Sequence, residues 1–342
     1  MPEPLGIGLL SGGLDSALAC KILAEAGAKV LCLHFFTGFC VTGHHSRVGR
    51  DNKPVANDAL QVGAELGIPV ELVDISEEYI DIVLHPRYGY GANMNPCIDC
   101  REFMLKKAKS YLEEINGDFV FTGEVIGQRP MSQTRSLLYA IEKRTGLKDR
   151  LLRPLSARLL PPTLVEREGR IDRAKLLAIQ GRSRQTQLKL AGKYRLTKFA
   201  QPAGGCCFLT DQAYSRKFRD VLNFKGERDI TMDDVYLLGV GRHFRLSAAL
   251  KLIIGRDEVE NNFLSRYDKQ YWTAAATGFP GPTVLILGEF GEAAAETIAA
   301  MTARYGDGKR ETEVEVELTF GDTKRRLRVA PASDDLIDSY RV

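Results

Sequence analysis

Short apolar runs alternate with longer amphipathic segments in the N-terminal part of the chain. Residues 5–10 and 29–36 are mostly apolar and contain branched or aromatic side chains, which predicts two β-strands. Between them, residues 15–26 carry apolar side chains at helical spacing and stop at Gly27, which predicts a helix. The unit recurs, with predicted helices at residues 54–66 and 100–115 and predicted strands at residues 69–75 and 118–122.

This alternation predicts an α/β fold built on a doubly wound parallel sheet. Strands such as VLCLHFF, residues 30–36, are apolar at nearly every position, as expected for a sheet covered on both faces. Apolar residues make up 44% of the chain and charged residues 27%, which excludes a mostly disordered chain and a coiled-coil rod. No apolar run approaches the roughly 20 residues of a membrane span, and no export signal is visible, so we expect a cytoplasmic protein without a membrane partner.

The pattern changes after the predicted sheet. Residues 37–57 are polar and predict a long loop, whereas residues 137–200 are basic and helical. From residue 212, short apolar runs separated by Gly and Pro predict an α+β region with a helix at residues 293–305 and a terminal strand pair. We therefore expect two domains, over residues 1–211 and residues 212–342.

Residues 11–16, SGGLDS, lie between the first predicted strand and the first predicted helix. Glycines at such a position let backbone N–H groups approach an anion, and the helix N-terminus adds its positive end. Ser11 and Ser16 add hydroxyl donors, and Asp15 suits a phosphate-bound Mg²⁺. The alternative is a plain glycine turn with a capping side chain. The segment lacks Gly-Lys-Ser/Thr, so it is not a Walker loop.

The seven cysteines differ in their sequence surroundings. Cys97 and Cys100 form a CxxC at the start of a helix beside Arg101, where both the helix N-terminus and the guanidinium are expected to lower thiol pKa values. Cys206 and Cys207 lie in a glycine-flanked loop. Cys20 and Cys32 belong to apolar faces and are predicted to be buried, and Cys40 is left unassigned.

A CxxC with one further cysteine allows two kinds of chemistry. Structural zinc requires four ligands, which adjacent cysteines rarely complete. Three thiolates suit a [4Fe–4S] cluster with one iron left open to hold a sulfide. Alternatively, one thiol carries a persulfide and another releases its sulfur by forming a disulfide. Cys97, Cys100 and one of Cys206 and Cys207 are the predicted trio, and the cluster is the favoured form.

In this order, SGGLDS, NPCIDC (residues 95–100) and GGCCFLTD (residues 204–211) resemble the motifs of PP-loop ATP pyrophosphatases that act as tRNA thiouridine synthetases. NPCIDC is similar to an element of the bacterial 2-thiouridylase, in which Asp commonly occupies the position of Cys97. TGEVIGQRPMSQ, residues 122–133, is similar to a segment of the 4-thiouridine synthetase. Residues 239–261 resemble an NFACT-like RNA-binding module.

The resemblance implies cleavage of ATP between its α- and β-phosphates, adenylation of a uridine carbonyl oxygen and replacement of that oxygen by sulfur. The expected cofactors are ATP and Mg²⁺ at the phosphate loop and, from the three thiols, a [4Fe–4S] cluster. The implied partners are tRNA and a sulfur donor, either inorganic sulfide or a persulfide carrier. Asp15, Cys97, Cys100 and Cys207 are the expected catalytic residues. The expected ATP-binding residues are Ser11, Gly12, Gly13, Asp15, Ser16, Phe35, Thr122, Gly123, Gln128, Ser132 and Gln133, with Gly127 beside them.

Basic residues gather at residues 129–153, 167–198 and 242–256, which favours contact with an RNA backbone. The predicted function is therefore an ATP-dependent tRNA sulfurtransferase, with residues 137–200 as the RNA-facing part of its catalytic domain. Three alternatives stay open: sulfuration of a small molecule or cofactor, an RNA-binding adaptor without catalysis, and an amide-forming PP-loop ligase. The last would need an ammonia source, and no glutaminase signature is visible.

Overall fold

The computed structural model describes residues 2–41, 57–129, 132–200 and 206–342. These residues form two compact units, one drawn from residues 1–43 and 56–210 and the other from residues 211–342. Most of the predicted polar loop, including His44 and His45, lies outside the described residues. Within the described part of the chain, no helix has the combination of length and apolarity that crossing a bilayer requires.

A five-stranded parallel sheet forms the centre of the first unit. Its spatial order is β3 (Val70–Asp74), β2 (Lys29–Phe36), β1 (Leu5–Leu9), β4 (Phe119–Thr122) and β5 (Leu151–Leu152). The chain builds outward from β1 to β3 and then returns to the other side of β1, so β1 and β4 flank the switch point.

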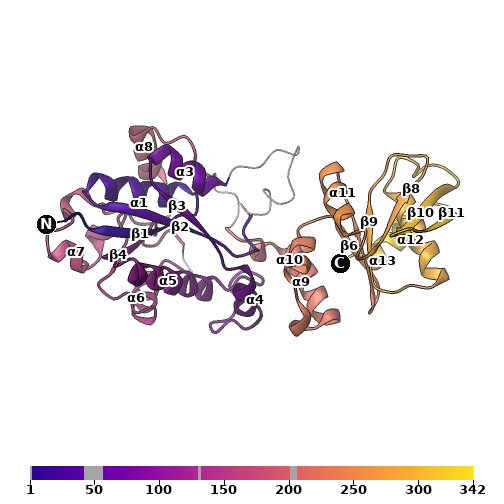
Figure 1. Ribbon diagram of the computed structural model, residues 1–342, viewed down its shortest axis with the longest axis horizontal. Helices are drawn as coiled ribbons and strands as arrows, with labels where there is room; N and C mark the ends of the chain where they lie inside the picture. Colours follow the sequence, from indigo (N-terminus) through magenta and orange to yellow (C-terminus); the bar gives the residue numbers. More distant parts are fainter. Residues whose placement is uncertain (1, 42–56, 130–131, 201–205) are drawn as a thin grey trace. The chain divides into compact units, whose positions relative to one another are not determined.

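Helices cover both faces of this sheet (Figure 1). One face carries α1 (Leu14–Glu25), α3 (Asp58–Leu66) and α8 (Gln185–Tyr194). The other carries α4 (Ser76–Leu84), α5 (Cys97–Glu114) and α6 (Arg135–Arg144). The predicted α/β fold is confirmed. The basic segment at residues 137–200 is less helical than expected, because it also contains β5, the short α7 (Leu164–Arg167) and two 3-10 turns.

Separate apolar cores lie on the two faces, as a doubly covered sheet requires. Leu18 and Leu23 of α1 are fully buried on one side, and Leu105 of α5 is fully buried on the other. Gly6 of β1 makes room for an aromatic ring, since a Cβ there would lie 2.5 Å from the ring of Phe119. Glycine in β1 therefore lets β4 bring a large side chain over the neighbouring strand.

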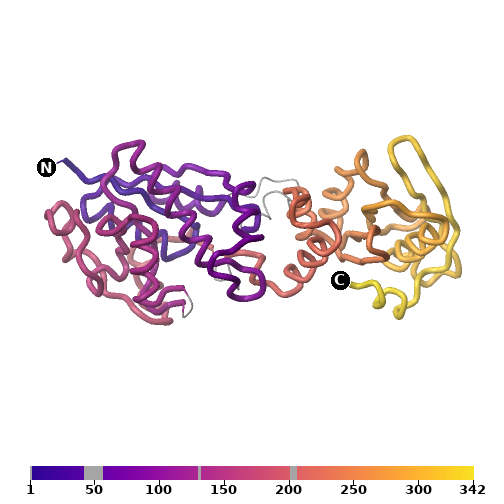
Figure 2. Tube along the Cα trace, turned by 90° about the horizontal axis from the view of Figure 1, so that it is seen from below, coloured from indigo at the N-terminus to yellow at the C-terminus, as the bar shows by residue number. Residues whose placement is uncertain are grey.

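The second unit contains a six-stranded sheet whose neighbouring strands are all antiparallel. It confirms the predicted C-terminal α+β architecture, and Figure 2 shows the terminal hairpin in yellow. The spatial order is β11 (Thr323–Val329), β10 (Val314–Phe320), β8 (Trp272–Ala276), β9 (Val284–Leu287), β7 (Leu250–Ile254) and β6 (Arg242–Ser247). The helices are α9 (Gln212–Lys225), α10 (Met232–Leu238), α11 (Glu258–Leu264), α12 (Glu292–Arg304) and α13 (Asp334–Tyr340).

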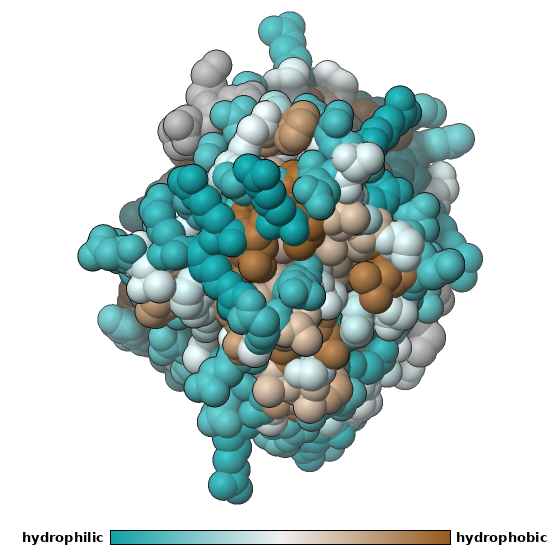
Figure 3. Space-filling model, turned by 90° about the vertical axis from the view of Figure 1, so that its right-hand side faces the viewer, coloured by the Kyte–Doolittle hydropathy of each residue, from teal (hydrophilic) through white to brown (hydrophobic). Residues whose placement is uncertain are grey.

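The helix α12 supplies most of the apolar surface that covers this sheet. Ile298, Ala299 and Met301 are fully buried against strand residues such as Val316 and Leu318. The second unit therefore has a core of its own. On the face seen in Figure 3, hydrophilic side chains surround a smaller hydrophobic area.

Candidate active site

The SGGLDS loop follows β1 at the switch point of the sheet. Gly12 has a φ of +78° and approaches α3 so closely that a Cβ would lie 2.6 Å from the Cβ of Asp58. The Ser16 hydroxyl donates to the Gly13 carbonyl at 2.8 Å, and the Ser11 and Ser16 hydroxyl oxygens are 3.2 Å apart. Gly13 is the N-cap of α1 and provides no side-chain acceptor, so this helix N-terminus can receive an anion.

Asp15 is held by one of its two carboxylate oxygens. The Gln128 amide donates to Asp15 Oδ2 at 2.9 Å, across 113 residues of sequence. Asp15 Oδ1 is buried and has no hydrogen-bond partner among the described atoms. A buried carboxylate oxygen without a partner is costly, and a bound cation would remove that cost. This orphaned oxygen therefore fits a Mg²⁺ bound with a nucleotide.

The end of β4 packs directly on the loop. A Cβ on Gly123 would lie 2.5 Å from the backbone of Asp15 and Ser16, so only glycine allows this approach. Thr122 is buried beside it, and its hydroxyl donates to Glu124 Oε2 at 2.9 Å. The structure thus brings these two predicted residues next to the phosphate loop.

The turn after β4 contains the other residues expected from the 4-thiouridine synthetase segment. Ser132 and Gln133 are both buried. Gln133 Oε1 accepts a hydrogen bond from Arg129 N at 3.2 Å, and its backbone carbonyl accepts one from Gly127 N at 2.8 Å. Gln133 therefore shapes this turn, while Gln128 reaches back to Asp15.

His34 and Phe35, near the end of β2, have different surroundings. Phe35 is buried in the core with Ile75 and Leu105, so its ring has a packing role, and an adenine contact stays a prediction. His34 Nδ1 lies 2.8 Å from the carbonyl of Leu10 and donates to it. Burial lowers the pKa of His34 despite this bond and the nearby Asp58, so the imidazole is neutral near pH 7 with Nε2 as an acceptor.

Five cysteines gather in the first unit. Cys97 and Cys100 begin α5, Cys206 and Cys207 precede a 3-10 turn, and Cys40 follows β2. Charges on Cys206, Cys40 and Cys97 would each raise the pKa of Cys100, and Cys100, Cys206 and Cys40 act in the same way on Cys207. The structure therefore brings Cys100 near Cys97 and near Cys207, and it adds Cys40, which the sequence left unassigned.

Backbone contacts hold these segments in place. Cys40 and Cys207 form an isolated antiparallel bridge, and the Cys40 thiol lies 3.1 Å from the Thr37 hydroxyl. Met94, in the loop before α5, donates its N–H to the Leu209 carbonyl at 3.1 Å. The position of Cys40 at the carboxyl end of a strand is the sequence signal that would have identified it.

Burial dominates the thiol chemistry. It raises the pKa of Cys100 although the Tyr79 hydroxyl forms a hydrogen bond with the thiol and acts in the opposite direction. Burial also raises the pKa of Cys207 well above its ordinary value. The prediction that the helix N-terminus and Arg101 lower the pKa of the CxxC thiols is therefore wrong for Cys100, because the cost of a buried thiolate outweighs both effects. Both thiols are neutral near pH 7 unless a ligand removes their protons.

A buried ion-pair network connects the thiols with the end of β4. Arg101, next to Cys100, pairs with Glu124, and Glu124 also pairs with Arg153 at 3.1 Å. Burial opposes the charge on Arg101, but Glu124 and then Cys97, Cys100 and Cys206 raise its pKa. Glu124 lies one residue after Gly123, which contacts the phosphate loop. A short chain of contacts thus runs from the loop to the cysteines.

The cysteines provide the sulfur donors that a thiolate-bound metal needs, but they do not form a complete metal-binding site. Soft thiolates beside a buried cation suit an iron–sulfur cluster. Over the residues that the structure describes, however, no three His, Cys, Asp or Glu side chains are grouped closely enough to hold one metal ion. The buried Cys20 and Cys32 belong to the core, as predicted, with their sulfur atoms 3.3 Å apart.

Some of the basic residues that suggested RNA binding are buried or form ion pairs within the fold. Arg153 is buried, and Arg170 pairs with Asp118 at 2.6 Å. In the second unit Lys251 pairs with Asp220 at 2.7 Å. The cations left exposed around α8 are Arg182, Lys189, Lys193, Arg195 and Lys198.

These features define an α/β protein whose candidate ligand site lies at the carboxyl ends of parallel strands. Residues 7–149 match the family model described as tRNA methyl transferase HUP domain. Residues 241–341 match the model described as NFACT protein RNA binding domain. The resemblance to PP-loop thiouridine synthetases with an NFACT-like C-terminal module is confirmed.

Curated relatives carry the same similarity. The chain is 34% identical over 122 residues to the tRNA-specific 2-thiouridylase MnmA of Flavobacterium johnsoniae, an alignment that covers 33% of this chain and 30% of that protein. It is 26% identical over 245 residues to the tRNA-specific 2-thiouridylase MnmA of Symbiobacterium thermophilum, which covers 64% and 58% of the two chains. In the alignment with the Flavobacterium protein, the chain spans less than a third of its relative's length.

A solved structure is also similar to part of the chain. It is the crystal structure of a 4-thiouridine synthetase–RNA complex with bound ATP, with 25% sequence identity and a TM-score of 0.34. The match covers 44% of this chain and 36% of that one.

Proposed function

We propose that this protein is an ATP-dependent tRNA sulfurtransferase that replaces a uridine carbonyl oxygen with sulfur. The observation that carries the proposal is the chain of contacts from the SGGLDS loop through Gly123, Glu124 and Arg101 to the cysteines. It places a nucleotide-type loop and a group of thiols in one unit, as a reaction at a single carbon requires. The similarity to 2-thiouridylases and the RNA-binding domain model supports RNA as the substrate.

The first step activates the carbonyl. The uridine oxygen attacks the α-phosphorus of ATP, and pyrophosphate leaves. The N-terminus of α1, with the hydroxyls of Ser11 and Ser16, receives the phosphates, and Asp15 is the candidate ligand of Mg²⁺. Mg²⁺, when bound, would neutralise phosphate charge. The uridine oxygen is thereby converted into part of an AMP leaving group.

The second step transfers the sulfur. A nucleophilic sulfur attacks the same carbon, the C–O bond to AMP breaks, and the carbonyl carbon becomes a thiocarbonyl. We propose Cys97, Cys100 and Cys207 as the residues that present the sulfur. A [4Fe–4S] cluster held by this trio would supply a sulfur-carrying site, and its iron would bind the cysteines as thiolates although burial raises the pKa values of Cys100 and Cys207. Without a cluster, one thiol would carry a persulfide, and a second thiol would release its sulfur.

The test is thiolation of unmodified tRNA by the purified, anaerobic protein with ATP, Mg²⁺ and a sulfur donor, which is sulfide in one arm and a persulfide carrier with a reductant in the other, followed by mass spectrometry of the nucleosides. We expect a thiouridine product that depends on ATP. Cys207→Ser should abolish the product while ATP binding persists, and Cys20→Ala, a buried thiol of the core, should retain it. Thiolation that survives in Cys207→Ser would contradict the proposal. Tight tRNA binding without formation of pyrophosphate would favour the adaptor instead.

The form of the sulfur carrier needs its own measurement. A cluster gives visible absorbance and bound iron in the anaerobic wild type, and both should be lost in Cys100→Ser. A persulfide gives neither signal, but it adds one sulfur atom to the intact mass, which dithiothreitol removes. Iron-free protein with full activity would exclude the cluster.

A further inference from the structure

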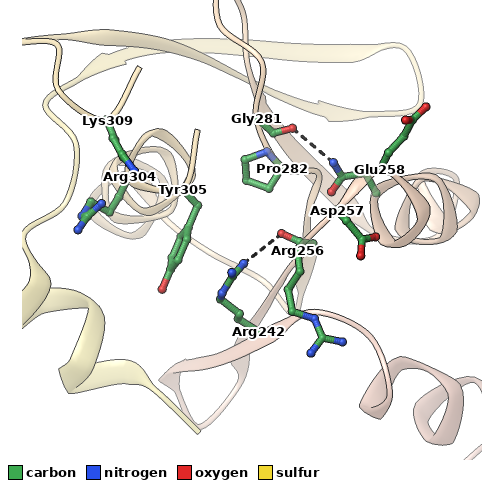
Figure 4. Close-up of a pocket in the computed structure, with 11 residues that line it drawn as sticks. Arg242, Arg256, Asp257, Glu258, Gly281, Pro282, Arg304, Tyr305 and Lys309 are labelled. Carbon is green, nitrogen blue, oxygen red and sulfur yellow. Dashed lines mark hydrogen bonds between the residues drawn. The ribbon is translucent and has the colours of Figure 1, made fainter. Parts of the chain in front are cut away.

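A polar cavity of about 450 Å³ lies within the second unit, and no residue of the phosphate loop and no cysteine lines it. It forms where β6 begins, β7 ends and β9 begins, so several elements contribute to its wall. Figure 4 shows Lys309, Arg304 and Tyr305 on one side of it and Asp257 and Glu258 on the other. A cavity of this size is in the range of roughly 300–1,000 Å³ that is typical of small-ligand sites. It has room for one nucleotide but not for a duplex.

The cationic side chains of the cavity differ in whether they already form an ion pair with a carboxylate. Arg256 pairs with Glu260, and Arg304 pairs with Asp334 at 2.6 Å. Arg242 and Lys309 have no carboxylate at ion-pair distance among the described residues, so their charge is available to an anionic ligand. Arginine and lysine both bind phosphate groups through charge-assisted hydrogen bonds, so a phosphate suits this pair of cations.

An aromatic platform adjoins these cations. The Arg242 guanidinium lies 5.0 Å from the ring centroid of Tyr305, and Arg242 Nη1 reaches the Gly255 carbonyl at 3.5 Å. Figure 4 shows Arg242 and Tyr305 converging on the same space. A guanidinium plane beside a tyrosine ring is a surface on which an unpaired RNA base stacks.

The carboxylates restrict the ligand further. Asp257 and the exposed Glu258 lie opposite the cations, and they would repel a bare tract of phosphates. They can accept hydrogen bonds from the amino groups of a base. The combination of cations, a stacking surface and acceptors therefore matches a nucleotide better than it matches a simple anion.

We propose that this cavity binds one unpaired ribonucleotide of the RNA substrate. Its phosphate would meet Arg242 and Lys309, its base would stack on Arg242 and Tyr305, and the base edge would face Glu258. This inference rests on the proposed function for the choice of RNA, and it adds a second point of recognition that is selective for unpaired RNA.

The test measures binding of the full-length protein to a fluorescent single-stranded oligoribonucleotide and to a blunt RNA duplex by anisotropy. Lys309→Gln and Tyr305→Leu should each weaken single-strand binding on the order of tenfold and leave duplex binding nearly unchanged. The matched control is Lys269→Gln, an exposed lysine of the same unit outside the cavity, which removes the same charge. Tyr305→Phe keeps the ring and should bind like the wild type.

Three results would overturn the proposal. They are unchanged single-strand binding in both cavity variants, an equal loss in Lys269→Gln, and displacement of the oligonucleotide by inorganic phosphate or a phosphopeptide at equal concentration. The binding assay needs no ATP and no sulfur. It therefore separates this inference from the proposed function, whose failure would appear as absent thiolation with intact binding to the cavity.

Discussion

The carboxylate of Asp15 illustrates how a single residue combines a structural and a binding role. One oxygen accepts the Gln128 amide at 2.9 Å, and the other is buried without a partner. The first contact joins the loop after β1 to the turn after β4. The second oxygen is the part of the loop best suited to a cation.

Replacement of Asp15 by Asn tests these separate roles of the two carboxylate oxygens. Asn keeps an oxygen that can accept from Gln128 but removes the negative charge, so the fold should persist. We expect the affinity for Mg²⁺·ATP to fall on the order of tenfold or more, as for loss of an interaction with a charged group. Isothermal titration calorimetry measures this change, with Asp172→Asn, which alters the cap of a distant 3-10 turn, as the control. Equal affinities for Mg²⁺·ATP in the two variants would contradict a role for Asp15 in binding the nucleotide.

Glu124 is the central charge of the network between the thiols and the phosphate loop. Burial raises its pKa, but the charges of Arg101 and Arg153 and the hydrogen bonds from Thr122 and Arg153 together outweigh burial, so the net pKa is below the ordinary value. Glu124→Gln leaves two guanidiniums without their shared anion. We expect a loss of about 3–5 kcal/mol in the free energy of unfolding at pH 7, measured by urea denaturation.

The same residue gives a prediction for pH dependence. Because the folded pKa of Glu124 is depressed, its stabilising contribution is fully present above the ordinary value of 4.5 and is lost as pH falls through the lower folded value. The stability difference between wild type and Glu124→Gln should therefore shrink below about pH 4.5. A difference that stays constant down to pH 3 would show that the charge is not its cause.

At the scale of elements, the site depends on how closely β4 approaches α1. Gly123 makes that contact without a side chain, whereas Gly192 lies in α8 with no atom within 4 Å of the position of an added Cβ. The two glycines thus provide a matched pair for the same substitution.

Gly123→Ala should force the end of β4 away from the loop, because the clashing atoms belong to the backbone of Asp15 and Ser16. We expect a loss of about 1–3 kcal/mol in stability together with weaker ATP binding. Gly192→Ala should raise stability by about 0.5–1 kcal/mol, since alanine favours the helix. Thermal unfolding and ATP titration of both variants check the pair, and equal effects would contradict the packing argument.

At the scale of the whole molecule, the proposed binding of tRNA combines the exposed cations around α8 with those of the second unit. The affinity for tRNA should fall steeply with salt, with a slope of log K against log salt of about −0.7 to −0.9 for each phosphate neutralised. Filter binding of tRNA to the full-length protein over a range of salt concentrations measures this slope. Affinity that does not change with salt would exclude a phosphate footprint.

Local patterns in the sequence were sufficient to predict the fold class. The apolar runs predicted β2 at its observed bounds, Lys29–Phe36, because a strand covered on both faces must be apolar at nearly every position. Helix ends were less certain. The sequence predicts that the helix of the CxxC begins at Cys100, whereas α5 begins at Cys97. The motifs SGGLDS, NPCIDC and GGCCFLTD indicated the kind of chemistry without any coordinates.

The tertiary structure alone decided which of these residues meet. The cysteines gather because loops after different strands end at one edge of the sheet, so Cys40 joins thiols that are distant in the sequence. The high pKa values of Cys100 and Cys207 and the internal pairing of Arg153 depend on burial. Burial is set by packing between distant segments, whereas a strand or a glycine turn is set by its own residues and their neighbours.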